Sequence, residues 1–231
     1  MWWSIPRIWE SGDVWIIGGG PSVPKQFGIP DKIIQDVVAG NLTPDAYSPY
    51  MKALHDKHVI GVNIAFMIGS WVDMVFFGDI SFFRNQERRL AAFPGLKVSC
   101  NPGTERFPWV KTLGRDGQNS TGISGKPDKV SWNGNSGAAA VSVAVHAGAK
   151  RVILLGFDMS LNEQGQQHWH DVYGRRFRPK NKPLRLPFSA HLRGFNKMEM
   201  DAKRLGVEII NANPGSAIPN FRKVNVRDIL K

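Results

Sequence analysis

Residues 13–22 read Asp-Val-Trp-Ile-Ile-Gly-Gly-Gly-Pro-Ser, an apolar strand pattern that runs directly into a glycine cluster. Glycine at the exit of a strand lets backbone N–H groups approach a phosphate or a ribose, because no Cβ stands in the way. In an open parallel sheet, ligands bind at the carboxyl ends of the strands. The stretch therefore predicts a nucleotide site, with a plain glycine-rich turn as the alternative. Its spacing supports neither Gly-x-Gly-x-x-Gly nor a P-loop.

Short apolar segments alternate with helical patterns along the rest of the chain. We expect further strands at 58–63, 72–77, 96–99, 151–155 and 207–211, and helices at 26–39, 136–147 and 195–205. This alternation predicts an α/β fold, a Rossmann-like, mostly parallel sheet flanked by helices. Most of the strands end in Gly, Asp, Asn or Ser, so polar residues gather at one edge of the sheet. Residues 101–134 are rich in Gly, Pro, Asn and Ser and are expected to form a long irregular excursion.

Length and composition narrow the class of protein. The chain has 231 residues, 42% of them hydrophobic, and no linker divides it, so we expect a single α/β domain over residues 1–231 with an irregular lid region. No apolar run approaches the ~20 residues of a membrane helix, and the first residues lack the form of a signal peptide. The lone Cys100 excludes an internal disulfide and fits a reducing cytoplasm. A cytoplasmic protein without a membrane span is predicted.

The formal net charge of +11 favours anionic partners: nucleotides, nucleic acid or acidic lipid surfaces. Much of this charge lies in residues 174–185, which read Gly-Arg-Arg-Phe-Arg-Pro-Lys-Asn-Lys-Pro-Leu-Arg. We call residues 171–190 the basic arm. Its functional interpretation is a lid that meets phosphates, and its alternative is a solvated loop. The residues that would contact phosphate are Tyr173, Arg175, Arg176 and Arg178.

Two histidines lie close together in the run His168-Trp169-His170-Asp171. On a strand, His168 and His170 would share one face. A zinc site needs a third ligand, and none is suitably spaced nearby, so the sequence favours a substrate-contacting or structural pair. His146 lies among Ala and Val in a predicted helix, which favours a packed, hydrogen-bonded side chain.

Four separated pieces of the chain form a familiar ordered set. They are Ile17-Gly18-Gly19-Gly20-Pro21-Ser22, Gly61-Val62-Asn63-Ile64-Ala65-Phe66, Asn135-Ser136-Gly137 through Gly156-Phe157-Asp158, and Asn211-Ala212-Asn213-Pro214-Gly215-Ser216. The set resembles the lipooligosaccharide-type bacterial sialyltransferases, which use a CMP-sugar donor. It also resembles the related DUF115 family, which includes the MptE-like hydroxymethyl-dihydropterin diphosphokinases. Neither the 101–134 excursion nor the basic arm has a counterpart in these families.

The resemblance to the sialyltransferases implies a role for each matched piece. The nucleotide-sugar would be held by Gly18, Gly20, Pro21, Ser22, Asn63, Asn135, Ser136, Gly137, Asn213 and Pro214. The catalytic base would be His191, because a neutral imidazole can accept a hydroxyl proton near pH 7. Asp158 would bind a hydroxyl or a metal, or cap a helix. The free N–H groups at a helix N-terminus attract anions. This agrees with the role in nucleotide binding that the resemblance implies for residues 135–137, which open a predicted helix.

One difference from the sialyltransferase pattern leaves a second class of enzyme as an alternative. The sialyltransferases place tyrosines after Gly-x-Asp to hold the leaving phosphate, and here Ser160 and Gln166 fall near those places. The MptE-like enzymes show an Asp at the end of the third strand and a His after Gly-x-Asp, and Asp79 and His168 fit that pattern. Diphosphate transfer would use ATP with Mg²⁺, for which Asp79 and Asp158 are suitable hard ligands.

The sequence therefore predicts a nucleotide-dependent transferase. The preferred chemistry is glycosyl transfer from a nucleotide-sugar, with CMP-sugar as the first choice, to a hydroxyl on a small molecule or glycan. The alternatives are the Mg²⁺-dependent diphosphokinase and a non-catalytic, basic nucleic-acid-binding protein, of a kind found in phage, on the same fold. For Trp2, Trp3 and Trp9, core packing or a homo-oligomer contact is favoured over a base-stacking platform.

Overall fold

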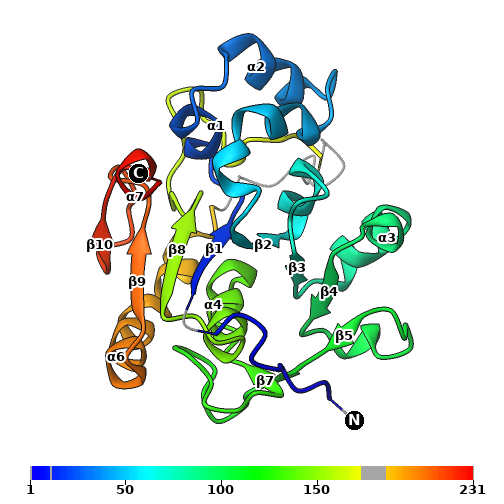
Figure 1. Ribbon diagram of the computed structural model, residues 1–231, viewed down its shortest axis with the longest axis vertical. Coiled ribbons are helices and arrows are strands. Elements are labelled where there is room, and N and C mark those ends of the chain that lie inside the picture. Colours follow the sequence, from blue (N-terminus) through cyan, green and yellow to red (C-terminus); the bar gives the residue numbers. More distant parts are fainter. Residues whose placement is uncertain (1, 11, 173–185, 231) are drawn as a thin grey trace.

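The computed structural model describes residues 2–10, 12–172 and 186–230. Its main sheet has eight strands in the order β10-β9-β8-β1-β2-β3-β4-β5, and every neighbouring pair is parallel. The predicted Rossmann-like α/β fold is thereby confirmed (Figure 1). The strands are β1 (Asp13–Ile17), β2 (His58–Val62), β3 (Met74–Phe77), β4 (Leu96–Ser99), β5 (Lys111–Thr112), β8 (Arg151–Leu155), β9 (Glu208–Asn211) and β10 (Arg222–Lys223), with β6 (Gly114–Arg115) and β7 (Lys129–Val130) forming a separate pair.

Helices connect most of these strands. The α-helices are α1 (Ser22–Gln26), α2 (Asp31–Ala39), α3 (Ile80–Ala92), α4 (Ser136–His146), α5 (Phe188–Leu192), α6 (Phe195–Leu205) and α7 (Val226–Ile229), and the 3₁₀ helices are η1 (Pro44–Tyr50), η2 (Lys52–Leu54), η3 (Asn63–Ile68) and η4 (Pro102–Thr104). The single helix predicted for 26–39 is wrong. Gly28, at a φ of +65°, and Pro30 separate α1 from α2, because the left-handed glycine and the missing proline N–H interrupt a helix.

Side chains alternate between the two faces of the sheet. On β1, Val14 and Ile16 join the core beneath α4 and α6, whereas Trp15 and Ile17 join the core beneath α1, α2, α3 and η1. All four side chains are 0–1% exposed. Burial on both faces explains why the strands read as continuous apolar runs. Figure 1 shows α4 and α6 on one side of the strands and α1 and α2 beyond their ends.

The order of the strands reverses at β1. The chain proceeds from β1 through β2, β3, β4 and β5 on one side, and then places β8, β9 and β10 on the other. β1 and β8 pair along their whole length, from Asp13 with Arg151 to Ile17 with Leu155. Such a reversal opens a crevice at the carboxyl ends of the two strands, which is where ligands bind in open α/β sheets.

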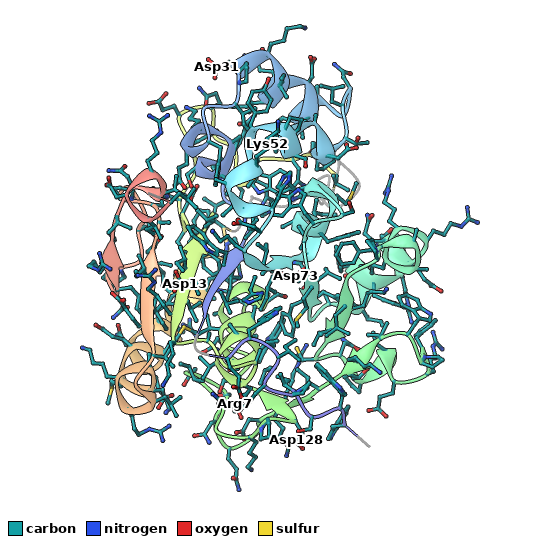
Figure 2. The ribbon with its side chains drawn as sticks, in the orientation of Figure 1. Arg7, Asp13, Asp31, Lys52, Asp73 and Asp128 are labelled. Atoms are coloured by element: carbon teal, nitrogen blue, oxygen red, sulfur yellow. The ribbon has the colours of Figure 1, made fainter. Side chains whose placement is uncertain are left out.

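Two carboxylates, Asp13 and Asp73, lie at the amino ends of β1 and β3, at the opposite edge of the sheet (Figure 2). Asp13, at the start of β1, receives a hydrogen bond of 2.8 Å from the Arg151 Nε. Asp73 precedes β3 and accepts a 2.8 Å hydrogen bond from the Val59 N–H. These carboxylates are used in holding strands together, so they are not available for chemistry.

The excursion over residues 101–134 is irregular apart from η4 and the short strands β5, β6 and β7. The N-terminal segment ties it down through the Trp3 N–H to Thr112 O bond (2.8 Å) and the Ile5 N–H to Pro127 O bond (2.9 Å). Asp201 on α6 accepts from the Ile123 N–H at 3.0 Å. The later part of the excursion therefore lies on the α4 and α6 side, where Leu113, Ile123 and Val130 join the core, whereas Val110 joins the core on the opposite face. Among the described residues, no helix has both the length and the apolar character needed to cross a membrane.

Candidate active site

A cavity of about 300 Å³ lies at the carboxyl edge of the sheet, where the strand order reverses. Its walls come from the loops after β1, β2, β3 and β8, from the start of α4 and from α5. The volume is at the lower end of the range for small-molecule sites. The sequence-predicted residues that line it are Gly18, Gly20, Asn63, Asp79, Asn135, Ser136, Gly137, Asp158, His168 and His191.

The glycine loop after β1 packs directly on the loop after β8. The Gly18 N–H donates to Leu155 O at 2.8 Å, and the Gly20 N–H donates to Gly156 O at 2.9 Å. A Cβ on Gly20 would lie 2.6 Å from both Gly156 O and Asp158 Cγ. From the sequence, these glycines were expected to let a ligand approach the backbone. Close contact between two loops of the protein already requires them.

Asp158 is held by three donors at the centre of this contact. Its Oδ1 accepts from the Ser22 hydroxyl at 2.6 Å and from the Asn213 side-chain amide at 2.8 Å, and its Oδ2 accepts from the Ser22 N–H at 2.8 Å. The side chain is buried, and this burial raises the pKa of Asp158, while the donors oppose the rise. Asp158 therefore links the loops that follow β1, β8 and β9.

Ser22 and Asn213 do not line the 300 Å³ cavity. Together with Pro214, they line a second cavity of about 610 Å³. Pro21 is buried at the start of α1. The structure thus brings Gly20 and Asn63 into one pocket and places Ser22 in its supporting wall. Their predicted contact with a nucleotide stays a prediction.

Two asparagines of the cavity have a buried side-chain atom without a protein partner. Asn63, directly after β2, has a left-handed φ of 52°, and its Oδ1 meets no donor among the described residues. Asn135 caps α4 by accepting from the Ala138 N–H at 3.0 Å, which leaves its Nδ2 without a described acceptor. Buried polar atoms are nearly always partnered, and an unmet one costs about 1–3 kcal/mol. One acceptor and one donor are therefore available to a ligand.

His168 is fixed against the glycine loop by its neighbour in sequence. The Trp169 N–H donates to Gly19 O at 3.0 Å, and its indole N–H donates to Gly18 O at 2.8 Å. A Cβ on Gly19 would lie 2.7 Å from His168 Nδ1, so the imidazole covers that glycine. Residues 167–169 form bends and not a strand, so the shared face that a strand would give His168 and His170 does not apply. The rings of His168 and His170 nevertheless stack, 5.3 Å apart and 9° from parallel.

His191 reaches the cavity from the last turn of α5. Burial lowers its pKa, and the charge of Asp79 raises it. Burial also lowers the pKa of His168, as does the charge of His191, so the two imidazoles interact electrostatically. A neutral imidazole near pH 7 is the form that can accept a proton. The packed interpretation of His146 is confirmed, since its Nε2 lies 2.8 Å from Ser124 O.

An aromatic wall of the cavity was not predicted. Trp132 lines the pocket with the guanidinium of Arg115 over its ring, the Cζ atom 3.9 Å from the centroid. Arg115 also donates to Gly78 O at 2.8 Å, which fixes the cation in place. Trp132 lies three residues before the helix-capping Asn135, but its place in the pocket depends on Arg115 and Gly78, so no local sequence signal reveals it. The other unpredicted lining residues include Met159, Ser160, Gln167 and Phe188.

Two predictions remain: a metal site, and contact between the basic arm and phosphate. The described part of the chain contains no group of three or more His, Cys, Asp or Glu side chains that could hold a metal ion. Tyr173, Arg175, Arg176 and Arg178 of the basic arm lie outside the described residues, so their proposed contact with phosphate stays a prediction.

Several solved glycosyltransferases have a similar backbone. The sialyltransferase CstII from Campylobacter jejuni, in complex with cytidine-5'-monophosphate, is 14% identical with a TM-score of 0.50, covering 93% of this chain and 85% of its own. The α-2,3-sialyltransferase Cst-I from the same organism is 13% identical with a TM-score of 0.54, covering 94% and 81%.

The MAf glycosyltransferase from Magnetospirillum magneticum is 13% identical with a TM-score of 0.58, and the match covers 96% of this chain but 35% of that one. No family model matches the sequence, so the resemblance to the DUF115 family stays a prediction. No curated protein matches it either. At these identities the likeness concerns the fold alone. The chain has the Rossmann-like α/β fold that these sialyltransferases and glycosyltransferases share.

Proposed function

We propose that the protein transfers a sugar from a nucleotide-sugar, with CMP-sugar as the first choice, to a hydroxyl group of a small molecule or glycan. The observation that carries the proposal is the pair of unpartnered amide atoms, Asn63 Oδ1 and Asn135 Nδ2, in one cavity. A nucleotide offers matching groups, since its base edge and ribose carry both donors and acceptors. The cavity lies at the strand-order reversal of a fold shared with a sialyltransferase that is solved with CMP.

The chemistry assigned to the cavity needs one base. His191 takes the proton from the acceptor hydroxyl, and the oxygen attacks the anomeric carbon of the donor. The bond between that carbon and the phosphate oxygen breaks, and its electron pair stays on the phosphate. The charge of Asp79, which raises the pKa of His191, stabilises the imidazolium that forms. The cationic side chains of the basic arm would approach the departing phosphate.

A thermal-shift panel tests the choice of ligand. It compares CMP, CMP-sugar, UDP-sugars, GDP-sugars and ATP, each with and without Mg²⁺. A hundredfold excess of ligand over its Kd stabilises the folded state by about 2.7 kcal/mol. For a chain of this size, that corresponds to a rise in Tm of about 5–10 °C. We expect this rise with CMP and CMP-sugar and without a need for Mg²⁺.

The matched variant in this panel is Asn63→Gly, which removes the amide and still accepts the left-handed φ. At the same ligand concentration it should lose about half of the nucleotide-induced shift, because a tenfold weaker affinity lowers the stabilisation to about 1.4 kcal/mol. A shift with ATP and Mg²⁺ alone would replace the proposal by diphosphate transfer. A response to DNA or RNA, with none to any nucleotide, would point to a nucleic-acid-binding role.

A further inference from the structure

The charges lining the cavity do not suit the product of the proposed reaction. The described lining includes the carboxylates of Asp79 and Asp158 and the imidazoles of His168 and His191, and no lysine or arginine. Cleavage of the donor releases a nucleoside monophosphate, whose phosphate carries close to two negative charges at neutral pH. Two carboxylates would repel it. The N-terminus of α4, at Ser136 and Gly137 in the same lining, supplies only a partial positive charge, so a side-chain cation is expected beside it.

His168 is the described side chain that can supply this charge without leaving its place. Trp169 anchors its backbone to Gly18 and Gly19 on one side, and the Tyr47 hydroxyl donates to Trp169 O at 3.1 Å on the other. Its ring lies over the glycine loop that follows β1, and it belongs to the lining of the cavity. An imidazole in this position faces the loop by which the fold receives a nucleotide.

We propose that His168, in its protonated form, binds the phosphate of the donor and stabilises that phosphate as it leaves. This assignment rests on the proposed function. The imidazolium N–H donates to the phosphate oxygen that receives the electron pair of the broken carbon–oxygen bond. The proton of the acceptor hydroxyl goes to His191, and the proton of His168 stays on His168. Atoms and charge balance without a metal ion, since the products are the glycoside, the nucleoside monophosphate and one proton.

Several groups influence the protonation of His168. His170 is stacked on it from its own segment, His191 faces it from α5, and Asp79 and Asp158 lie in the same cavity wall. Burial lowers the pKa of His168, a hydrogen bond to the Gly19 backbone opposes this, and the charge of His191 lowers the pKa further. A bound phosphate reverses this balance, so binding should take up a proton from solution. The resulting imidazolium repels a proton on His191, which keeps the base in its active, neutral form.

Calorimetric titration with CMP and with cytidine tests the assignment, with each ligand measured in two buffers of different ionisation enthalpy. Near pH 7.5, wild-type protein should take up close to one proton with CMP and none with cytidine. The His168→Gln variant keeps a hydrogen-bonding side chain but cannot become cationic. It should bind CMP at least tenfold more weakly, take up no proton and bind cytidine as the wild type does. His58→Gln, at the exposed amino end of β2, is the matched control and should match wild type.

A second measurement does not depend on the folding of a variant. In the wild-type protein, imidazole NMR should show that one buried histidine becomes protonated when CMP is added. Proton uptake that persists in folded His168→Gln would overturn the assignment, as would an equal loss of CMP and cytidine affinity. Loss of CMP binding only on replacing Arg175, Arg176 and Arg178 by Ala would assign the charge to the basic arm instead.

A different result would contradict the proposed function. If the protein binds CMP with proton uptake but transfers no sugar from CMP-sugar, the transferase proposal is wrong and the role of His168 in phosphate binding stands. If no nucleotide or nucleotide-sugar of the thermal-shift panel binds, both are wrong.

Discussion

The Ser22 hydroxyl donates a 2.6 Å hydrogen bond to Asp158 Oδ1, across 136 residues of sequence. The backbone N–H of Ser22 donates to the second oxygen of the same carboxylate at 2.8 Å. These bonds connect the start of α1 to the loop after β8. They give the cavity a rigid wall, because the carboxylate that lines it cannot turn without losing both.

Replacement of Ser22 by Ala should destabilise this wall. The variant removes one donor to a buried carboxylate, which costs about 1–3 kcal/mol in the free energy of unfolding. It leaves the backbone N–H bond intact, so the fold should be kept. Chemical denaturation followed by tryptophan fluorescence measures the difference. An unchanged free energy of unfolding would mean that the bond contributes nothing to stability.

The pH dependence of stability follows from the same carboxylate. Burial raises the pKa of Asp158 above its ordinary value, so the folded state binds its proton more tightly than the unfolded state does. The contribution of Asp158 to stability is therefore most favourable at acid pH and declines as the pH rises from the ordinary carboxyl pKa through the raised one. Ser22→Ala raises the pKa further, and its destabilisation should be larger near pH 7 than near pH 4. The opposite trend would contradict this account.

The glycine loop offers a matched pair of substitutions. Gly20→Ala places a Cβ 2.6 Å from the Gly156 carbonyl oxygen and from Asp158, and overpacking of this kind costs about 1–3 kcal/mol. Gly117→Ala adds a Cβ with no atom within 4 Å, so it should be neutral or stabilising by about 0.4–1 kcal/mol. Thermal unfolding compares the two. Equal effects would show that loop contact does not explain Gly20.

Asn63 allows backbone strain to be separated from ligand binding. Both Asn63→Gly and Asn63→Ala remove the unpartnered Oδ1, and only alanine resists the φ of 52°, at a cost of about 1–2 kcal/mol. We expect the two variants to lose nucleotide affinity equally, by about tenfold, which is one hydrogen bond. Only the alanine variant should also show a lower Tm. If the glycine variant binds normally, Asn63 has no contact with the ligand.

The Asn135→Asp variant removes the Nδ2 donor and keeps a side chain that can cap α4. The carboxylate still accepts from the Ala138 N–H, and aspartate is as good an N-cap as asparagine, so the Tm should be kept. The Nδ2 donor is replaced by a negatively charged acceptor beside an anionic ligand. We expect a loss of nucleotide affinity of tenfold or more, with little change for a neutral nucleoside beyond the lost hydrogen bond. Asn135→Ala is the contrast, since it should lower both the Tm and the affinity.

The base assigned to His191 makes a prediction about rate and pH. His191→Ala should lower kcat by roughly a hundredfold or more, with the affinity for donor nearly unchanged. Asp79→Asn removes the charge that raises the pKa of His191. The base then stays unprotonated to lower pH, so the acid limb of the kcat/KM profile should move to lower pH. A profile that moves to higher pH, or His191→Ala with full activity, would remove His191 from the mechanism.

The elements with strong local signals were predictable from the sequence. The helix expected at 195–205 has those bounds as α6, because the left-handed Gly206 ends it at a φ of +65°. The strands at 96–99 and 151–155 also have the expected bounds: the first alternates apolar and polar residues after Pro94 and Gly95, and the second is an apolar run that ends at Gly156. The helix α3 was missed. Its buried Phe82, Phe83 and Leu90 lie on one face, but a run of arginines and polar residues conceals that period.

The candidate site was predictable only where a residue directly follows a strand or opens a helix. Asn63, Asp79 and Asn135 occupy such places, and the parallel sheet brings them to one edge. Trp132 lies in the irregular excursion and owes its position to Arg115 and Gly78, which are distant in sequence. Ser22 and Asn213 were assigned to a ligand from the family resemblance, and their bonds to Asp158 could not be foreseen because they cross from one loop to another.

The late arrival of β8 has a consequence during synthesis. Until β8 emerges, β1 is the edge of a growing β1–β5 sheet and presents its Val-Trp-Ile-Ile backbone unpaired. Exposed apolar edges of this kind recruit other chains. At about 5–20 residues per second, the 136 residues that separate Ser22 from Asp158 take roughly 7–27 s to translate. Nascent chains should therefore be most prone to aggregate within this interval, and nucleotides added to the translation mixture should not protect them before it ends.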